Sequence, residues 1–380
     1  RAHKEGIVGA MVGAHEKMFA APGLDFIRGE ARFTGERTVT IALQDGGERT
    51  IRGERVLINL GSRPARPAIP GLWESGAWTN EEILRLEELP SSLAIIGASY
   101  IGVEFASMMA TFGVDVTLIS SGEHVLPRED EDAARVLEDV FERRGVRVMP
   151  RSRASAVERT EDGSGVIVTL SDGRKVSGTH CLVAIGSIPN TEDLGLDAAG
   201  VEHAPSGHIT VDGVSRTSVN NIYAAGDCTG VYPLASVAAM QGRIAMAHIL
   251  GDAVRPLRTD KVAANIFTSP EIATVGISEN DLHEGSYRGE AVTLQLSTNP
   301  RAKMMAMRDG FVKVFARRHS GTVIGGVVVG QRASELIYPI ALAVEKKLTV
   351  DDLAETFTVY PSLSGSIAEA ARKLHTRGKF

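Results

Sequence analysis

The residues whose types and spacing are best suited to chemistry form a glycine-rich run, Gly97-Ala98-Ser99-Tyr100-Ile101-Gly102. It follows an apolar stretch typical of a buried strand and precedes a helical pattern, as a dinucleotide-binding turn requires. Gly97 permits the tight turn, Ser99 stands where backbone N–H groups must approach a diphosphate, and Gly102 allows close helix–strand packing. Unpaired N–H groups and the dipole at the helix N-terminus would favour the anion. A glycine-rich turn that binds nothing is the alternative.

The second strand of this predicted βαβ unit ends in Leu118-Ile119-Ser120-Ser121. A carboxylate at that point would hold the ribose 2′-hydroxyl of NADH, and Ser120 stands there instead. NADH therefore loses a charge-assisted hydrogen bond worth about 1.5–3 kcal/mol, and the 2′-phosphate of NADPH meets no repulsion. We expect a weak coenzyme preference or a tilt toward NADPH. His124 and Arg128, just downstream, either help to bind the phosphate or are solvated loop residues.

A second candidate site is Gly226-Asp227, which directly follows the apolar run 222–225. A carboxylate at the C-terminal end of a buried strand lies where α/β sheets usually bind ligands. An Asp after a Gly is also a common turn residue, so the motif alone is not decisive. Similar strand endings occur at Gly61-Ser62 and at Gly186-Ser187.

The composition excludes several classes of protein. A net charge of −6 argues against a basic surface for nucleic acid. No apolar run approaches the roughly 18 residues that a membrane span needs. Two cysteines, Cys181 and Cys228, exclude a disulfide framework and favour a reducing compartment, so we expect a cytoplasmic protein. They are 47 positions apart and are interpreted as small buried residues. No metal site is predicted.

The order of apolar runs and helical patterns predicts an α/β fold. Residues 4–20 have helical spacing, and short strands are expected at Leu24–Arg28, Val39–Leu43 and Arg55–Leu60. A βαβ pattern begins at Ser92, and beyond a linker around Pro256 strands and helices follow an α+β order. The predicted domains are residues 1–88 with 187–256, residues 89–186, and residues 257–380.

Taken together, these motifs resemble the flavoprotein disulfide reductase family, in particular its lipoamide dehydrogenase-like members. The resemblance covers essentially the whole chain and includes two further segments, Phe267-Thr268-Ser269-Pro270-Glu271-Ile272-Ala273 and Tyr360-Pro361-Ser362-Leu363-Ser364. It implies two Rossmann-like nucleotide-binding domains, the FAD one N-terminally incomplete, and a C-terminal α+β dimerisation domain. The expected assembly is a homodimer, and the expected cofactors are FAD and NAD(P)H.

The resemblance also implies roles for individual residues. Asp227 would bind the ribityl chain of FAD, and the backbone of Leu234 and Ala235 would approach the isoalloxazine. Tyr100 would cover the nicotinamide pocket and move on coenzyme binding, while Glu104 would lie by the flavin. A packed helix face with one exposed carboxylate is the alternative for Tyr100 and Glu104. The expected cofactor-binding set is Gly61, Gly97, Ser99, Tyr100, Gly102, Glu104, Ser120, Gly186, Gly226, Asp227, Leu234 and Ala235.

Two departures from the family pattern bear on function. Family members begin with a glycine-rich FAD-binding βαβ unit and a Cys-x4-Cys redox pair, and neither is in this chain, so we expect that it lacks an N-terminal FAD-binding segment. The family also places a His before the Pro of the C-terminal motif and a Glu four residues after that Pro. Here these positions are Tyr360 and Gly365. A phenol, with an ordinary pKa near 10, is no base for thiol chemistry near neutrality.

The sequence therefore favours an NAD(P)H:quinone reductase-type flavoprotein. Hydride would pass from the nicotinamide to FAD, and electrons would pass on to a small acceptor such as a quinone, with Tyr100, Glu104 and Tyr360 as the catalytic residues. Tyr360 either shapes the acceptor pocket, donates a proton to a quinone oxygen, or merely fills the space of the missing imidazole. The alternatives are a lipoamide dehydrogenase or related disulfide reductase, and a non-catalytic nucleotide-binding protein.

Overall fold

The computed structural model describes residues 1–375 and divides into two compact units. Unit 1 consists of residues 1–63 and 188–257, and unit 2 of residues 64–187 and those from 258 onward. Each unit combines helices with sheets, which confirms the predicted α/β class. The finer division into three domains stays a prediction. The short strands β5 (Ser62–Pro64) and β13 (Ser187–Pro189) pair with each other. Each strand includes a position in the sequence at which one unit ends and the other begins.

Unit 1 is built on two small sheets. The strands β1, β2 and β3 form an antiparallel sheet in that order, and β4 pairs in parallel with β14. Buried side chains from β1, β4, β14, α5 and η1 share one core. Because β4 and β14 pair in parallel, their C-terminal ends lie side by side. The elements of unit 1 are α1 (Ala2–Phe19), β1 (Gly29–Gly35), β2 (Thr38–Leu43), β3 (Glu48–Arg52), β4 (Val56–Ile58), α5 (Leu196–Ala199), β14 (Ile222–Ala224), the 3-10 turn η1 (Asp227–Thr229) and α6 (Ala235–Ile249).

The N-terminal segment agrees with the sequence only in part. The helix predicted for residues 4–20 is confirmed by α1, which begins at Ala2 and has no buried side chain. The strand predicted at Leu24–Arg28 is wrong, because β1 begins at Gly29. Gly29 pairs with Leu43, the last residue of β2, so the residues before Gly29 have no partner in that strand. Within residues 1–375 no helix, α1 included, has the length and apolar character needed to cross a bilayer.

The first part of unit 2 contains a parallel sheet with the strand order β12-β6-β7-β8. The side chains of β6 and β7 are almost all buried, as expected for strands covered on both faces. A separate antiparallel sheet, β9-β10-β11, lies between β8 and β12 in the sequence. The elements are α2 (Asn80–Ile83), β6 (Ser92–Ile96), α3 (Tyr100–Thr111), β7 (Asp115–Ile119), α4 (Glu131–Arg143), β8 (Arg147–Met149), β9 (Ala154–Arg159), β10 (Val166–Leu170), β11 (Lys175–Gly178) and β12 (His180–Val183).

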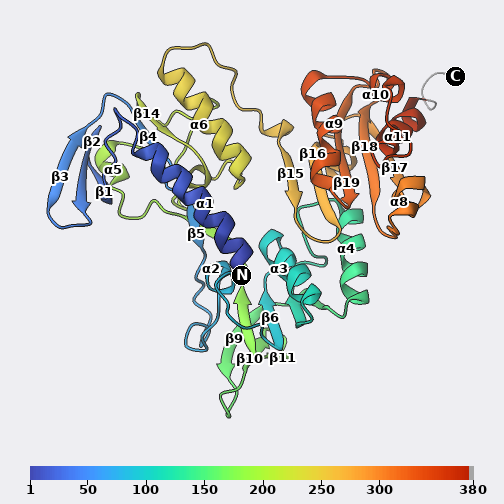
Figure 1. Ribbon diagram of the computed structural model, residues 1–380, viewed down its shortest axis with the longest axis horizontal. Coiled ribbons are helices and arrows are strands. Elements are labelled where there is room, and N and C mark those ends of the chain that lie inside the picture. Colours follow the sequence, from blue (N-terminus) through green and yellow to red (C-terminus); the bar gives the residue numbers. More distant parts are fainter. Residues whose placement is uncertain (376–380) are drawn as a thin grey trace. The chain divides into compact units, whose positions relative to one another are not determined.

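The rest of unit 2 is a five-stranded antiparallel sheet with the order β15-β16-β19-β18-β17. Helix α9 packs on β16 and β19, and α11 packs on β17 and β18, as Figure 1 shows. The elements are η2 (Thr259–Lys261), β15 (Ala263–Ile266), β16 (Glu271–Gly276), α7 (Glu279–His283), β17 (Gly289–Gln295), η3 (Leu296–Thr298), α8 (Pro300–Met304), β18 (Phe311–Arg317), β19 (Val323–Gly330), α9 (Ala333–Lys346), α10 (Val350–Glu355) and α11 (Gly365–His375).

The alternation of β18 sends its side chains into two different cores. Val312 and Val314 pack with α9 and α11, whereas Phe311 and Phe315 join the core of the parallel sheet and of α3 and α4. Because side chains alternate between the two faces of a strand, Lys313 lies on the same face as Phe311 and Phe315. The residue is 0% exposed. An ammonium group is thus buried at the contact between the five-stranded sheet and α4.

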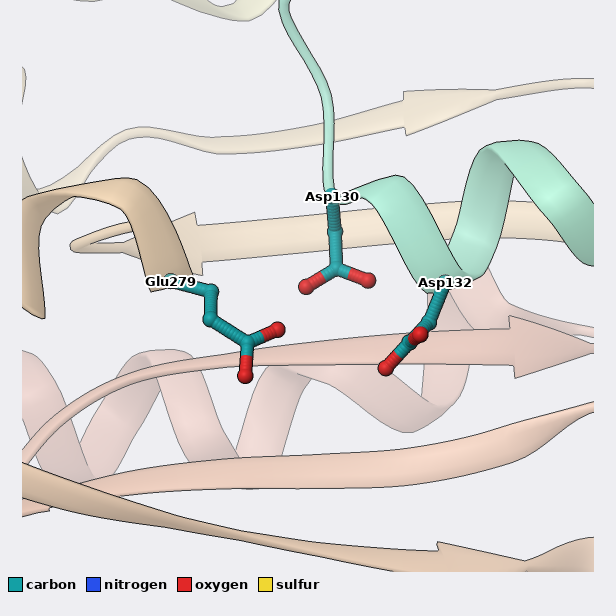
Figure 2. Close-up of side chains that lie close together, drawn as sticks. All are labelled: Asp130, Asp132 and Glu279. Atoms are coloured by element: carbon teal, nitrogen blue, oxygen red, sulfur yellow. The ribbon is translucent and has the colours of Figure 1, made fainter. Parts of the chain in front are cut away.

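Three carboxylates surround this ammonium. Lys313 Nζ lies 2.8 Å from Asp130 Oδ2, 2.7 Å from Asp132 Oδ2 and 2.5 Å from Glu279 Oε2. Figure 2 shows the three acidic side chains turned toward one another, from the start of α4 and the start of α7. Burial lowers the pKa of Lys313, but its hydrogen bonds to the acids outweigh burial and raise it above the ordinary value. The lysine is therefore the counter-ion of this cluster.

Candidate nucleotide sites

The glycine-rich turn has a geometry that only glycine satisfies. Gly97 has a φ of +110°, and a Cβ built on it would lie 2.3 Å from the carbonyl oxygen of Ala184. A Cβ on Gly102 would lie 1.9 Å from the carbonyl oxygen of Gly97. Real non-bonded contacts are far longer, so both positions require the absence of a side chain. The turn therefore brings α3 onto the ends of β6 and β12 as closely as a dinucleotide fingerprint demands.

The N-terminus of α3 has no side-chain cap. Ser99 is the N-cap residue, and its side chain makes no capping hydrogen bond. By contrast, Asp130 caps α4 through Ala133 N–H, and Thr349 caps α10 through Asp352 N–H. The first N–H groups of α3 are thus not satisfied by a side chain, which suits an incoming diphosphate.

Tyr100, the first residue of α3, contacts the loop that follows β7. Its hydroxyl donates a hydrogen bond to Glu129 Oε1 at 2.6 Å. The same loop is tied to the glycine-rich turn by the backbone of Leu126, whose N–H donates to the carbonyl of Ala98 at 2.8 Å. Burial raises the pKa of Glu129, and the hydrogen bond from Tyr100 opposes that shift. No sequence signal singled out Glu129, because it lies 29 positions from Tyr100 in a charged loop.

The end of β7 carries no carboxylate. Ser120 is buried, and its hydroxyl contacts the carbonyl oxygens of Gly122 at 3.4 Å and His124 at 3.1 Å. His124 Nδ1 lies 3.0 Å from Glu138 Oε2, so its ring is held by α4, whereas Arg128 is exposed. Ser120 therefore shapes its own loop. Its expected part in coenzyme binding stays a prediction, as does that of His124 and Arg128.

Glu104 links α3 to the loop between β15 and β16. Its Oε1 accepts a hydrogen bond from Phe267 N–H at 2.8 Å. Burial raises the pKa of the Glu104 carboxyl, and this hydrogen bond lowers it in part. One turn further along α3, Ser107 Oγ accepts a hydrogen bond from Ser269 N–H at 3.1 Å. Both contacts position the 267–269 loop on α3.

In unit 1 the second motif forms a hydrogen-bonded cluster around Asp227. The hydroxyl of Ser62 donates to Asp227 Oδ2 at 2.8 Å, which joins the start of β5 to the start of η1. Gly226 has a φ of +80°, and its N–H donates to Gln241 Oε1 at 2.9 Å. Gln241 is 1% exposed and also donates to Thr229 Oγ1 at 3.3 Å. Sequence reasoning missed Gln241, since an amide on a helix has no distinctive pattern.

The remaining candidates lie at turns or helix ends. Gly61 and Gly186 have φ values of +65° and +116°, which favour glycine. Leu234 is the N-cap residue of α6 and Ala235 its first residue, and no side chain caps this helix. The N-terminus of α6, like that of α3, thus has no capping hydrogen bond from its N-cap side chain.

The C-terminal motif lies between α10 and α11. Tyr360 is 83% exposed, and its neighbours Phe357 and Val359 are strongly exposed as well. Gly365 begins α11, and a Cβ built on it would have Ser362 Oγ as its nearest neighbour at 3.6 Å. The fold would thus accept a side chain at position 365. The segment presents an aromatic and apolar surface.

Neither cysteine resembles a reactive thiol. Burial raises the pKa of Cys181, on β12, to about 12. Cys228 is buried in η1, where its Sγ donates to Ala225 O at 3.2 Å, and burial raises its pKa too. A thiolate is the reactive form, so both act as small core residues in this part of the chain.

Comparison with known proteins shows one family along the chain. A family model described as pyridine nucleotide-disulphide oxidoreductase matches residues 4–242. The model of that family's dimerisation domain matches residues 262–371. The matches include both glycine motifs, Asp227 and the C-terminal segment around Tyr360.

Individual relatives agree with this match. A protein named NAD(P)H dehydrogenase (quinone) from Mycobacterium tuberculosis is 51% identical over 332 residues, which are 87% of this chain and 66% of the relative. A dihydrolipoyl dehydrogenase from Haloferax volcanii is 35% identical over 97% of this chain and 78% of its own length. The crystal structure of LpdA from M. tuberculosis has a TM-score of 0.90 at 46% identity, covering 98% of this chain and 82% of that one. The chain thus spans just under two thirds of the quinone dehydrogenase.

Proposed function

Because the chain belongs to the pyridine nucleotide-disulphide oxidoreductase family, we propose that it works as an FAD-dependent NAD(P)H dehydrogenase that reduces a quinone-type acceptor without a thiol–disulfide relay. The observation that carries the proposal is the pair Tyr360 and Gly365, which leaves the C-terminal motif without an imidazole and without a carboxylate to orient one. A disulfide relay needs a base that takes and returns a thiol proton. The 51% identity to a protein named NAD(P)H dehydrogenase (quinone) supports the same activity.

The residues of unit 1 fit part of an FAD site. Ser62 holds Asp227 through Oδ2, and the structure gives Oδ1 no hydrogen-bond partner among residues 1–375. A carboxylate oriented in this way can accept a hydrogen bond from a hydroxyl of the ribityl chain. The uncapped N-terminus of α6, at Leu234 and Ala235, would bring backbone N–H groups to the isoalloxazine. When bound, FAD supplies the hydride and electron chemistry.

The residues of unit 2 fit NAD(P)H. The α3 N-terminus would bind the diphosphate, and Gly186 would line the nicotinamide nucleotide site. Tyr100 would cover the nicotinamide, and Glu104 would keep α3 and the 267–269 loop in register beside the flavin. These residues bind and orient the cofactors, and they exclude water from the reacting atoms.

We propose that the active form is a homodimer. Residues 262–371 match the dimerisation domain of the family, and the exposed side chains of Phe357, Val359 and Tyr360 would be covered by a second copy. Burying apolar and aromatic side chains of this kind favours association. Tyr360 would then contribute to the acceptor pocket. It would either donate a proton to the quinone oxygen or only line the pocket.

A dihydrolipoyl dehydrogenase is the second candidate, because a relative of that name matches 97% of this chain. A panel of acceptors distinguishes the two. With the full-length, flavin-loaded protein and NADPH, we expect turnover with a soluble benzoquinone at least roughly a hundredfold above that with lipoamide, since the base position holds a phenol. Stopped-flow flavin absorbance with each acceptor is the measurement, and the variant Tyr360→Phe is the control for a wall-only role.

Rapid lipoamide turnover, on the order of 10² s⁻¹ and so well within the enzymatic range, would contradict the quinone assignment. A protein that binds no flavin would instead favour a non-catalytic nucleotide-binding role. Loss of quinone turnover in Tyr360→Phe, with flavin reduction intact, would assign proton donation to the Tyr360 hydroxyl.

Coenzyme preference gives an independent prediction. We expect kcat/KM for NADH to exceed that for NADPH by no more than about a hundredfold, because no carboxylate ends β7. A carboxylate introduced at the exposed Ser121 should repel the 2′-phosphate and lower the NADPH/NADH ratio of kcat/KM by roughly tenfold or more. Steady-state kinetics of Ser121→Glu against Ser121→Ala measure this. An unchanged NADPH/NADH ratio of kcat/KM would show that the ribose 2′-position does not bind near residue 121.

A further inference from the structure

The loop that follows β7 carries a carboxylate beside the N-terminus of α3. Leu126 anchors this loop to the glycine-rich turn, with a φ of +52° and a side chain only 2% exposed. Glu129 follows three residues later, and its N–H donates to the carbonyl of Leu126 at 2.9 Å. The backbone therefore holds Glu129 in a defined place, where its side chain reaches the first residue of α3.

Among residues 1–375, no basic side chain forms an ion pair with Glu129 or contributes to its pKa shift. Its Oε1 accepts from the Tyr100 hydroxyl, and within residues 1–375 the structure gives it no ion-pair partner. Its neighbour Asp130 carries a further negative charge, and Lys313 is bonded to Asp130, Asp132 and Glu279 rather than to Glu129. Arg128 is exposed and makes no ion pair within the same described range. A half-buried carboxylate without a cation interacts strongly with any other anion brought near it.

We propose that Glu129 is a positioning residue that holds the Tyr100 side chain against the β7–α4 loop and opposes coenzyme binding. This inference rests on the proposed function, in which the α3 N-terminus binds the diphosphate and Tyr100 covers the nicotinamide. Two effects then act in the same direction. The anionic diphosphate meets the carboxylate at the same end of α3, and movement of Tyr100 breaks a hydrogen bond to an ionised acceptor. Each makes the coenzyme bind less tightly while Glu129 is ionised.

The direction of the pH dependence follows. Since burial raises the pKa of Glu129, the carboxylate becomes neutral as the pH falls toward that raised value. A neutral carboxyl neither repels the diphosphate nor binds the phenol as strongly. Coenzyme affinity should therefore rise as the pH falls. The part of this pH dependence that is due to Glu129 should vanish when residue 129 has no titratable group.

The test uses NAD⁺ as the probe and the full-length, flavin-loaded protein in its oxidised form. NAD⁺ is chosen because its diphosphate does not titrate between about pH 5.5 and 8, unlike a 2′-phosphate. We expect Glu129→Gln to bind NAD⁺ on the order of tenfold more tightly than the wild type at pH 8. At pH 5.5 the difference should shrink, since a larger fraction of the wild type then has the neutral carboxyl. Titration calorimetry at both pH values gives the dissociation constants.

Glu131→Gln is the matched control. Glu131 lies two residues after Glu129, is exposed and pairs with Arg135. Its replacement by glutamine therefore removes the same charge without changing a contact of Tyr100. We expect less than about a twofold effect from it, as is usual for a screened surface charge. The double variant Tyr100→Phe/Glu129→Gln tests the link, because the gain from Glu129→Gln should be smaller when the hydroxyl is already absent.

The outcomes separate this inference from the function it rests on. Equal or weaker NAD⁺ binding by Glu129→Gln, or an equal gain in Glu131→Gln, would overturn the role of Glu129. A pH profile of NAD⁺ affinity that is the same in Glu129→Gln as in the wild type would overturn it too. If NAD(P)H fails to reduce the flavin of the wild-type protein, the proposed function fails, whatever the calorimetry shows.

Discussion

Replacing Lys313 by methionine is expected to lower the free energy of unfolding by about 3–5 kcal/mol at pH 7, the usual cost of leaving a buried charge without its partner. The side chain lies between β18 and α4, and its ammonium contacts three carboxylates within 2.8 Å. Methionine fills the space but leaves the three negative charges facing one another. Urea unfolding followed by circular dichroism measures the loss.

The pH dependence of this loss has a definite sign. Without the lysine, burial and repulsion by the neighbouring carboxylates raise the pKa of Asp130 further in the folded variant. Acids with raised pKa values in the folded state destabilise it above their unfolded pKa of about 4, and this cost decreases as the pH falls toward that value. The difference between the wild type and Lys313→Met should therefore narrow from pH 7 to pH 5. In the wild type the raised pKa of Lys313 keeps its contribution complete below about 10.5.

Lys175→Met is the matched control. Lys175 pairs with Glu158 at 3.4 Å, but both side chains are well exposed. An exposed pair contributes about 0–1 kcal/mol, so this variant should be close to the wild type. Similar losses in the two lysine variants would show that the three carboxylates do not depend on Lys313 for their charge balance.

Replacing Gly102 by alanine is expected to lower kcat/KM for NAD(P)H by at least about a hundredfold. The added methyl would lie 1.9 Å from the carbonyl oxygen of Gly97, so α3 must shift away from the turn. A displacement of this kind misplaces the N–H groups that we propose bind the diphosphate, and a misplacement of about 1 Å can cost a hundredfold. Stopped-flow reduction of the flavin by NADPH measures the effect.

Because a clash in a packed turn also lowers stability, two controls accompany Gly102→Ala. Gly13→Ala adds the same methyl within α1, where the built Cβ has no neighbour within 4 Å other than the adjacent residues and the helix's own backbone. It should leave the kinetics unchanged and stabilise the helix by about 0.5–1 kcal/mol. Flavin content and circular dichroism identify the fraction of Gly102→Ala that is folded. A folded Gly102→Ala that reduces its flavin at the wild-type rate would disprove the placement of the coenzyme on α3.

The sequence by itself determined the features that depend on local geometry. The positions of Gly97 and Gly102 could be predicted because a tight turn and a close helix contact exclude a side chain within a few residues of each other. Asp227 could be placed at the end of a strand, and Tyr360 and Gly365 could be compared with a short motif. The longer helices and most strands followed from the spacing of apolar residues, whereas the short helices α2, α5, α7, α8 and α10 were not predicted. Leu24–Arg28 did not form a strand, because β2 ends before it can pair with them.

Only the tertiary structure decided which distant groups meet. Ser62 bonds to Asp227 across 165 positions, and Glu104 to Phe267 across 163. The alternation of β18 assigns Lys313 to a face, but the acids on that face come from α4 and α7, and no spacing within β18 specifies them. Glu129 likewise meets Tyr100 only because Leu126 ties one loop to another. Periodicity indicates which way a side chain points, whereas its partner depends on how the elements pack, and that is a property of the whole fold.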